Sequence, residues 1–339
     1  MTAFLVRRAF LSLLVLVAVS YGSFVLIATK FSSTCYSNYT PTGAFPPLAD
    51  SAAHATTLWL AWLRSVPSGQ AFRNQCSATG TQNVLTGLSH TSALLGVTLV
   101  LVLVLSLALG VLAAVRKGGM SDFGFRAFSY TAWAVPPFLL ALVLQSALLS
   151  MTHRGWHLFP VSGWPDTGCS PTFNFCEPAS HVNPALHTAK VLQALVVPAV
   201  ALSVAFVGLH SRYLRSSLLV AFSSPYTDTA RAKGLSERRI VLRHALRNSA
   251  GVFLSVLLLD IGAVIGASLA VDYVFRLGGL GLVFLGMIGG LGSQSGDGPK
   301  YLDPYAVMSL LTLTAIFVAV ASLVAELVVI WLDPRVRPA

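Results

Sequence analysis

Charged residues are scarce in this sequence. Asp, Glu, Lys and Arg make up 10% of its 339 residues, whereas hydrophobic residues make up 55%. Soluble domains carry roughly 25% charged residues. This scarcity excludes a soluble globular protein. Because the apolar residues extend along the whole chain, it also excludes a soluble domain with a single anchor. The composition indicates an integral membrane protein.

A phosphate-binding loop is also missing. No Gly-x-x-x-x-Gly-Lys-Ser/Thr string occurs, so we expect the chain to have no phosphate-binding loop of its own. We also expect it to bind no cofactor. No nucleophile is clustered with an acid or a base, which argues against an enzyme. His153 and His157 have the i, i+4 spacing of a metal-binding pair on a helix, but no carboxylate accompanies them. We interpret them as interfacial polar residues and expect no metal site.

Six charge-poor runs are long enough to cross a membrane, because a helix needs about 20 apolar residues to span the hydrocarbon core. They lie at about 9–29, 91–115, 127–152, 191–211, 248–271 and 304–332. Lipid leaves backbone groups no outside partner, so these runs must be helices. The first run begins like a signal peptide, but it is longer than such an apolar core. We predict a single all-α transmembrane domain over residues 1–339 with the first helix retained.

The basic residues predict the orientation. Most of the 22 Lys and Arg residues fall in alternate connections close to the ends of the runs, which is typical of cytoplasmic segments. Both termini are therefore predicted to be cytoplasmic. The cytoplasmic loop lies at 212–247 and the large outer loops at about 30–90, 153–190 and 272–303. Topology and anionic membrane lipid account for the net charge of +10, so we expect no nucleic acid partner.

The sequence has few cysteines, and all four fall in the predicted outer loops. Disulfides persist outside the cytosol, and four cysteines allow three pairings. Loop membership favours Cys35 with Cys76 and Cys169 with Cys176; free thiols and metal binding are the alternatives. The first outer loop also contains Trp59 and Trp62 in a short apolar patch, which suits an amphipathic helix at the membrane interface.

A charged island at residues 224–248 stands between apolar runs. Ser223 or Ser224 can cap a helix that has Pro225 in its first turn. Asp228 lies near this N-terminus, where the positive end of the helix dipole stabilises a negative charge. Gly234 is expected to end this helix, and Ser236 to cap a second one over residues 237–248. The pattern predicts a short helix followed by a turn, which a partner can grip. The alternative is an ordinary basic loop that only fixes topology.

The island carries a family resemblance in two strings, Thr229-Ala230-Arg231-Ala232-Lys233-Gly234-Leu235-Ser236 and His244-Ala245-Leu246-Arg247-Asn248. They resemble the coupling loop of ABC-transporter permease subunits, and more narrowly that of the dipeptide/oligopeptide/nickel permease family. Other matches include Arg7-Arg8, Pro136-Pro137-Phe138, Val274-Phe275, Gly279-Leu280-Gly281 and the end of the chain from Leu332 to Arg337. The similarity covers roughly residues 1–29 and 85–337.

The resemblance implies that this loop docks on a cytoplasmic ATPase. Asp228, Ala230 and Gly234 match the acidic, small and glycine positions of the loop motif. The coupling role extends by resemblance to Tyr226, Asp228, Thr229, Ala230, Arg231, Ala232, Lys233, Gly234, Leu235, Ser236, Glu237 and Arg238.

The resemblance further implies a type I importer fold in the bacterial plasma membrane. The expected partners are a second, homologous permease subunit, two ATPase subunits or one fused ATPase, and an extracytoplasmic substrate-binding protein or lipoprotein. ATP and Mg would bind the ATPase partners. Di- or oligopeptides are the expected substrates, with nickel, haem or another small solute as alternatives. An ATP-independent secondary transporter is the main rival, although it would show inverted repeats that we do not find.

Five residues are candidates for the translocation path: Pro136, Pro137, Asp260, Gly279 and Gly281. A charge inside a membrane span is costly and points to function. Asp260 either lines the path and attracts a cationic group, or bonds a neighbouring helix. For Glu326, near the cytoplasmic end of the last run, we favour a structural role. The glycine-rich segment at 278–298 is interpreted as a re-entrant or gate-capping loop.

Overall fold

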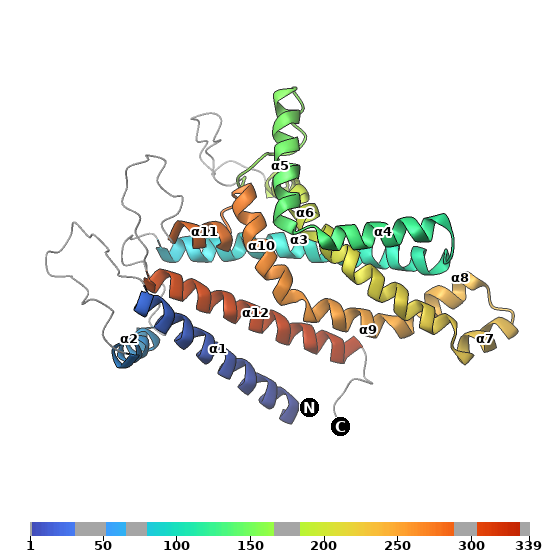
Figure 1. Ribbon diagram of the computed structural model, residues 1–339, viewed down its shortest axis with the longest axis horizontal. Helices are drawn as coiled ribbons and strands as arrows, with labels where there is room; N and C mark the ends of the chain where they lie inside the picture. The colour runs from blue at the N-terminus through green and yellow to red at the C-terminus, as the bar shows by residue number, and fades with distance from the viewer. Residues whose placement is uncertain (1, 31–51, 66–79, 166–183, 288–303, 333–339) are drawn as a thin grey trace. The chain divides into compact units, whose positions relative to one another are not determined.

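A computed structural model describes residues 2–30, 52–65, 80–165, 184–287 and 304–332 (Figure 1). Every regular element in these ranges is helical, which agrees with the predicted all-α class. The chain forms two compact units. The first comprises residues 1–91, 278–321 and 338–339, and the second comprises residues 92–277 and 322–337.

The first unit contains two helices that pack through aromatic side chains, α1 (Thr2–Lys30) and α2 (Ala52–Ser65). The rings of Tyr21 and Trp59 meet edge to face with centroids 5.3 Å apart, and the indole N–H of Trp59 donates to Ser20 Oγ at 3.3 Å. Trp62 is buried. The short helix predicted around Trp59 and Trp62 is therefore present, and Trp59 contacts α1.

The first unit also contains the start of α3 (Gly80–Val115), the short helix α11 (Leu280–Met287) and most of α12 (Pro304–Leu332). The hydroxyl of Thr91 accepts a hydrogen bond from the backbone N–H of Leu280 at 2.9 Å. A Cβ on Gly87 would lie 3.2 Å from the carbonyl carbon of Gly279, so α3 and the start of α11 are in close contact. The predicted re-entrant segment thus begins as a helix packed on α3.

The second unit is organised around α6 (Pro184–Phe222), which packs against α4 (Met120–Ala134), α5 (Pro137–His153), α9 (Leu246–Leu259) and α10 (Ile261–Phe275). Leu214 and Leu218 of α6 lie fully buried in an apolar cluster with Phe253 and Ala245. This cluster anchors the end of α6 that leads into the charged island.

The run predicted as one span at 127–152 is bent. α4 and α5 meet at 97°, and Val135 and Pro136 separate them. The bend is visible in Figure 1. Proline lacks an N–H, and it also disfavours helical geometry in the residue before it. Val135 is accordingly extended, with φ −87° and ψ 117°. Pro136 and Pro137 therefore divide this run instead of lying inside a straight helix.

The run predicted at 248–271 is also broken, this time without a proline. α9 ends at Leu259 and α10 begins at Ile261, and the axes of the two helical runs differ by 48°. Asp260 occupies the break. The sequence did not predict this bend.

Length and composition identify two described helices that are able to cross a membrane, at Thr86–Val115 and His187–Phe222. The number rises to four if each bent pair forms one span. Shorter apolar helices lie at Phe10–Val25 and Leu310–Val324 within the described parts of α1 and α12.

Candidate functional site

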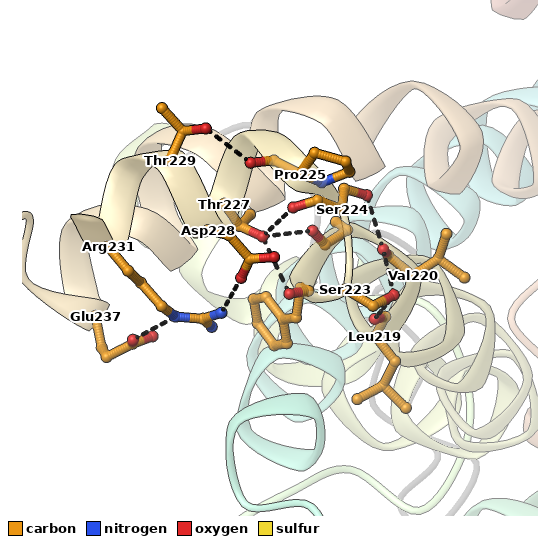
Figure 2. Close-up of polar contacts among 12 residues, drawn as sticks. Leu219, Val220, Ser223, Ser224, Pro225, Thr227, Asp228, Thr229, Arg231 and Glu237 are labelled. Atoms are coloured by element: carbon orange, nitrogen blue, oxygen red, sulfur yellow. Dashed lines mark hydrogen bonds and ion pairs between the residues drawn. The ribbon is translucent and has the colours of Figure 1, made fainter. Parts of the chain in front are cut away.

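The charged island forms the helix α7 (Pro225–Ala232), which is joined tightly to the end of α6 (Figure 2). Ser224 is extended at the capping position and Pro225 occupies the first turn, as the sequence predicted. The Ser224 hydroxyl does not cap α7; it donates instead to the carbonyl of Val220 at 2.9 Å. The buried hydroxyl of Thr227 donates to the carbonyls of Ser224 at 2.6 Å and Phe222 at 3.0 Å. Thr227 thus fixes the angle at which α7 leaves α6.

Gly234 ends α7 in the predicted manner. Its φ is +75°, in the left-handed region that glycine adopts without strain. The N–H of Leu235 donates to the carbonyl of Ala230 at 3.2 Å, and the N–H of Gly234 to that of Arg231 at 2.9 Å. These two hydrogen bonds form a Schellman motif, which satisfies the last carbonyls of the helix.

Arg231 links the two sides of the turn. Its Nε donates to Glu237 Oε1 at 2.8 Å and its Nη1 to Asp228 Oδ1 at 3.2 Å, as drawn in Figure 2. The hydrogen bond to Glu237, with the neighbouring negative charges, raises the pKa of Arg231 above its ordinary value. All three side chains are substantially exposed, so solvent screens these pairs and each contributes little to stability. Their effect is to hold α7 and the following helix in one orientation.

α7 has distinct inner and outer faces. Thr227 and Ala230, three residues apart, are buried. The residues predicted to couple are otherwise exposed along the outer side and the turn, except for the half-buried Leu235: Tyr226, Asp228, Thr229, Arg231, Ala232, Lys233, Gly234, Ser236, Glu237 and Arg238. The structure therefore brings the predicted residues together on one short surface element.

The turn leads directly into a predicted membrane span. Ser236 stands at the capping position of α8 (Glu237–Arg239) without a side-chain capping bond, and a π-helical turn, Ile240–Ala245, continues into α9. The second helix of the island is thus confirmed as part of one helical run, Glu237–Leu259. The π-helical turn was not predicted, and such turns are frequent at functional sites. Since α6 ends just before α7, the short helix α7 connects two long helical runs, Pro184–Phe222 and Glu237–Leu259.

The other path candidates lie in separate places. Pro136 and Pro137 stand at the α4–α5 bend, and Asp260 stands at the α9–α10 break. Gly279 and Gly281 are buried at the start of α11, in the first unit. The structure does not gather these five residues into one site within either unit.

Asp260 has a partner that the sequence reasoning missed. His210 of α6 is fully buried, and its Nε2 lies 3.2 Å from Asp260 Oδ2. Its Nδ1 lies 2.7 Å from the carbonyl oxygen of Phe206. A histidine inside an apolar run is a signal that was available in the sequence, although its pairing with Asp260 was not.

A buried ion pair in the first turn of α4 was also missed. Asp122 Oδ1 lies 2.8 Å from Nη2 of Arg215 on α6, and Asp122 Oδ2 accepts the backbone N–H of Gly118 at 3.2 Å. Arg126 is a more distant partner at 3.9 Å. The carboxylate therefore joins the turn between α3 and α4 to α6.

Several predictions fall outside the described residues. These are the pairings of Cys35, Cys76, Cys169 and Cys176, and the side chain of Glu326. The helical spacing proposed for His153 and His157 is wrong, because α5 ends at His153. Within the described part of the chain, no group of three or more potential metal ligands is present.

Comparison with known proteins identifies relatives. Residues 106–338 match the family described as binding-protein-dependent transport system inner membrane component. The oligopeptide transport system permease protein AppB of Bacillus subtilis (strain 168) is 29% identical over 282 residues, covering 82% of this chain and 79% of that protein. The dipeptide transport system permease protein DppB of Lactococcus lactis subsp. cremoris (strain MG1363) is 29% identical over 239 residues, covering 70% of this chain and 66% of that protein.

A solved structure shares the fold. A chain of the MetNI methionine ABC transporter, in an inward-facing conformation, superposes with a TM-score of 0.54 at 17% identity. The match covers 76% of this chain and 99% of that chain. At this identity the likeness concerns the fold alone.

Proposed function

Because this chain belongs to the family of binding-protein-dependent transport system inner membrane components, we propose that it is the permease subunit of an ATP-driven importer of di- or oligopeptides. The permease names of its relatives support the peptide substrate. The observation that carries the proposal is α7, a short exposed helix held between two long apolar helices.

The mechanism follows from how α7 is attached. ATP binding on partner subunits moves the surface that grips the outer face of α7. Thr227 transmits this movement to α6, and the turn braced by Arg231 transmits it through Glu237–Leu259 to the fifth predicted span. These helices then tilt and switch the side from which the path is open, as expected of a two-state element biased by a ligand.

The proposed assembly contains two related permease subunits, two ATPase subunits or one fused ATPase, and an extracytoplasmic substrate-binding protein or lipoprotein. ATP and Mg bind the ATPase partners. Six spans cross the bacterial plasma membrane with both termini in the cytoplasm, where α1 and α12 supply the first and last spans and each bent pair supplies one. Pro136, Pro137, Gly279 and Gly281 contribute to the path together with Asp260.

Substitution of Gly234 tests the coupling. Gly234→Val forces a β-branched residue into a left-handed conformation, which costs roughly 1–2 kcal/mol and favours a different turn between α7 and α8. The surroundings of Gly234 are open, so the strain acts on the backbone and creates no steric clash. We expect ATP hydrolysis by the reconstituted complex to persist while peptide uptake falls several-fold.

Gly234→Asn is the matched control, because asparagine tolerates the left-handed region. It should retain most of the uptake per ATP hydrolysed. If Gly234→Val transports peptide as well as the native chain does, α7 does not couple the two processes.

A further inference from the structure

The break in the fifth predicted span exposes a carboxylate that the coupling mechanism does not use. The Asp260 side chain is 32% exposed although it lies between two apolar helices, α9 and α10. A charged group within the membrane is strongly disfavoured against lipid chains. The open side of Asp260 therefore requires a polar or cationic neighbour.

His210 fixes the other side of this carboxylate. A carbonyl oxygen only accepts hydrogen bonds, so the Nδ1 atom that contacts Phe206 carries a hydrogen. In a neutral imidazole, Nε2 is then an acceptor. This buried atom makes no aligned hydrogen bond, although it lies 3.2 Å from Asp260 Oδ2. The rings of Phe206 and Phe253 lie beside the imidazole, and the backbone of Val256 supplies a further hydrogen-bond acceptor near it.

While the imidazole is neutral, the Asp260 carboxylate therefore keeps its full negative charge, which a proton or a cation can compensate. Within the described residues, no lysine or arginine lies within ion-pair distance of Asp260. A primary ammonium group supplies one positive charge and three N–H donors. Its hydrogen bonds to a carboxylate belong to the strong, charge-assisted class.

We propose that Asp260, positioned by His210, binds a protonated amino group of the transported solute at the α9–α10 break. The ammonium group approaches from the open side of the carboxylate, while His210 holds the buried side. This inference rests on the proposed peptide import, because a peptide brings its terminal ammonium group. His210 acts through Asp260 and is a positioning residue.

Paired substrates test the site. The complete transporter, with its ATPases and its substrate-binding protein, is reconstituted in liposomes. It is supplied with a tripeptide or with the same tripeptide lacking the terminal amino group, each at a concentration that saturates the substrate-binding protein. In Asp260→Asn, uptake of the amino form should fall about tenfold, as the loss of ~1.4 kcal/mol of binding predicts. Uptake of the deaminated form should stay unchanged.

Three further variants sharpen the result. Asp260→Glu keeps the charge and should restore preference for the amino form. His210→Asn should raise the KM for the amino form and leave kcat nearly unchanged, because it loosens the carboxylate without removing it. Ser255→Ala on α9 removes a hydroxyl that donates to the carbonyl of Gly251 within the same helix, and it should leave the preference unchanged.

Equal loss of both tripeptides in Asp260→Asn would show a structural role and overturn the site, and an unchanged preference would do the same. Failure of the native transporter to carry either tripeptide would instead contradict peptide import, and the site is then tested separately.

Labelling of Asp260 by a carboxyl-reactive carbodiimide is measured with ethylammonium or with tetramethylammonium, which has no N–H donor. Protection by ethylammonium alone supports the site. Labelling that depends on pH but on neither cation shows that a proton is the sole occupant, and it overturns the proposal.

Discussion

Two glycines determine how closely the helices around α6 approach. A Cβ on Gly208 would lie 2.8 Å from the carbonyl oxygen of Ser129 on α4. A Cβ on Gly110 would lie 2.9 Å from Cδ2 of Leu214, so α3 and α6 are equally tight. Small residues give membrane helices this close contact, because lipid provides little hydrophobic drive for their association.

Gly208→Val should therefore destabilise the protein by about 1–3 kcal/mol, the usual cost of overpacking a well-packed core. The valine would meet backbone atoms of α4, which cannot rotate away as a side chain can. Thermal unfolding of the purified protein in detergent measures the effect. Gly266→Val on α10 is the control, since a Cβ there meets nothing within 4 Å. Equal unfolding temperatures for the two variants would contradict the close packing of α4 on α6.

At the scale of elements, buried ion pairs fix the relative positions of neighbouring helices, which apolar contacts alone do not determine. Asp122 joins α4 and the preceding turn to α6 through Arg215. Its side chain is nearly inaccessible, and that of Arg215 is only 18% exposed. Removing one member of such a pair leaves the other charge without compensation, whereas removing both does not.

Asp122→Asn should lower the unfolding temperature by several degrees, and so should Arg215→Met. The unfolding temperature of the double variant should fall by less than the sum of the two single decreases, because neither charge is then left unpaired. Thermal unfolding of the three variants forms the double-mutant cycle. Arg126→Ala is the control: this side chain is exposed and lies 3.9 Å from Asp122, so its loss should be nearly neutral. Additive losses would show that Asp122 and Arg215 do not stabilise one another.

The sequence predicts elements where the signal is local. Pro225 and Gly234 set the ends of α7 through their own backbone preferences, so both ends were predicted. The bend at Pro136 was missed although its signal was present, because a hydropathy run does not register the missing N–H. The break at Asp260 could not be predicted in this way. Its partner, His210, belongs to a different helix, and only the packing of α6 on α9 and α10 reveals the pair.

At the scale of the molecule, the chain exposes two different kinds of surface, one apolar and one polar. Many large apolar side chains of α4, α5 and α6 are exposed, among them Trp133, Leu142 and Val196. Exposed apolar area of this extent marks contact with lipid or with another subunit. The turn around α7 is polar by contrast, and its exposed charges suit an aqueous partner. In the proposed assembly, the apolar surface faces the membrane and the second permease, and the polar turn faces the ATPase.

A cysteine placed on α7 should locate that ATPase directly. Thr229 is exposed, and its hydroxyl donates only to the carbonyl of Pro225 within the same helix, so Thr229→Cys should preserve the fold. In native membranes, a short thiol crosslinker should join it to a polypeptide that contains a Gly-x-x-x-x-Gly-Lys-Ser/Thr string, identified by mass spectrometry. The yield of the crosslink should change when ATP is added, because in the proposed mechanism ATP binding moves the ATPase surface that contacts α7.

Trp156→Cys provides the control for sidedness. Trp156 is 66% exposed and lies in the predicted outer loop after α5, so it should not crosslink to the ATPase. Crosslinking from position 156 but not from position 229 would reverse the predicted orientation, because an ATPase has access only to the cytoplasmic face. Crosslinking from neither position, with this chain purified alone, would favour a carrier that works without ATP. We expect crosslinking from position 229 alone, together with a second permease in the purified complex. This expectation follows from the attachment of α7 to α6 and α9.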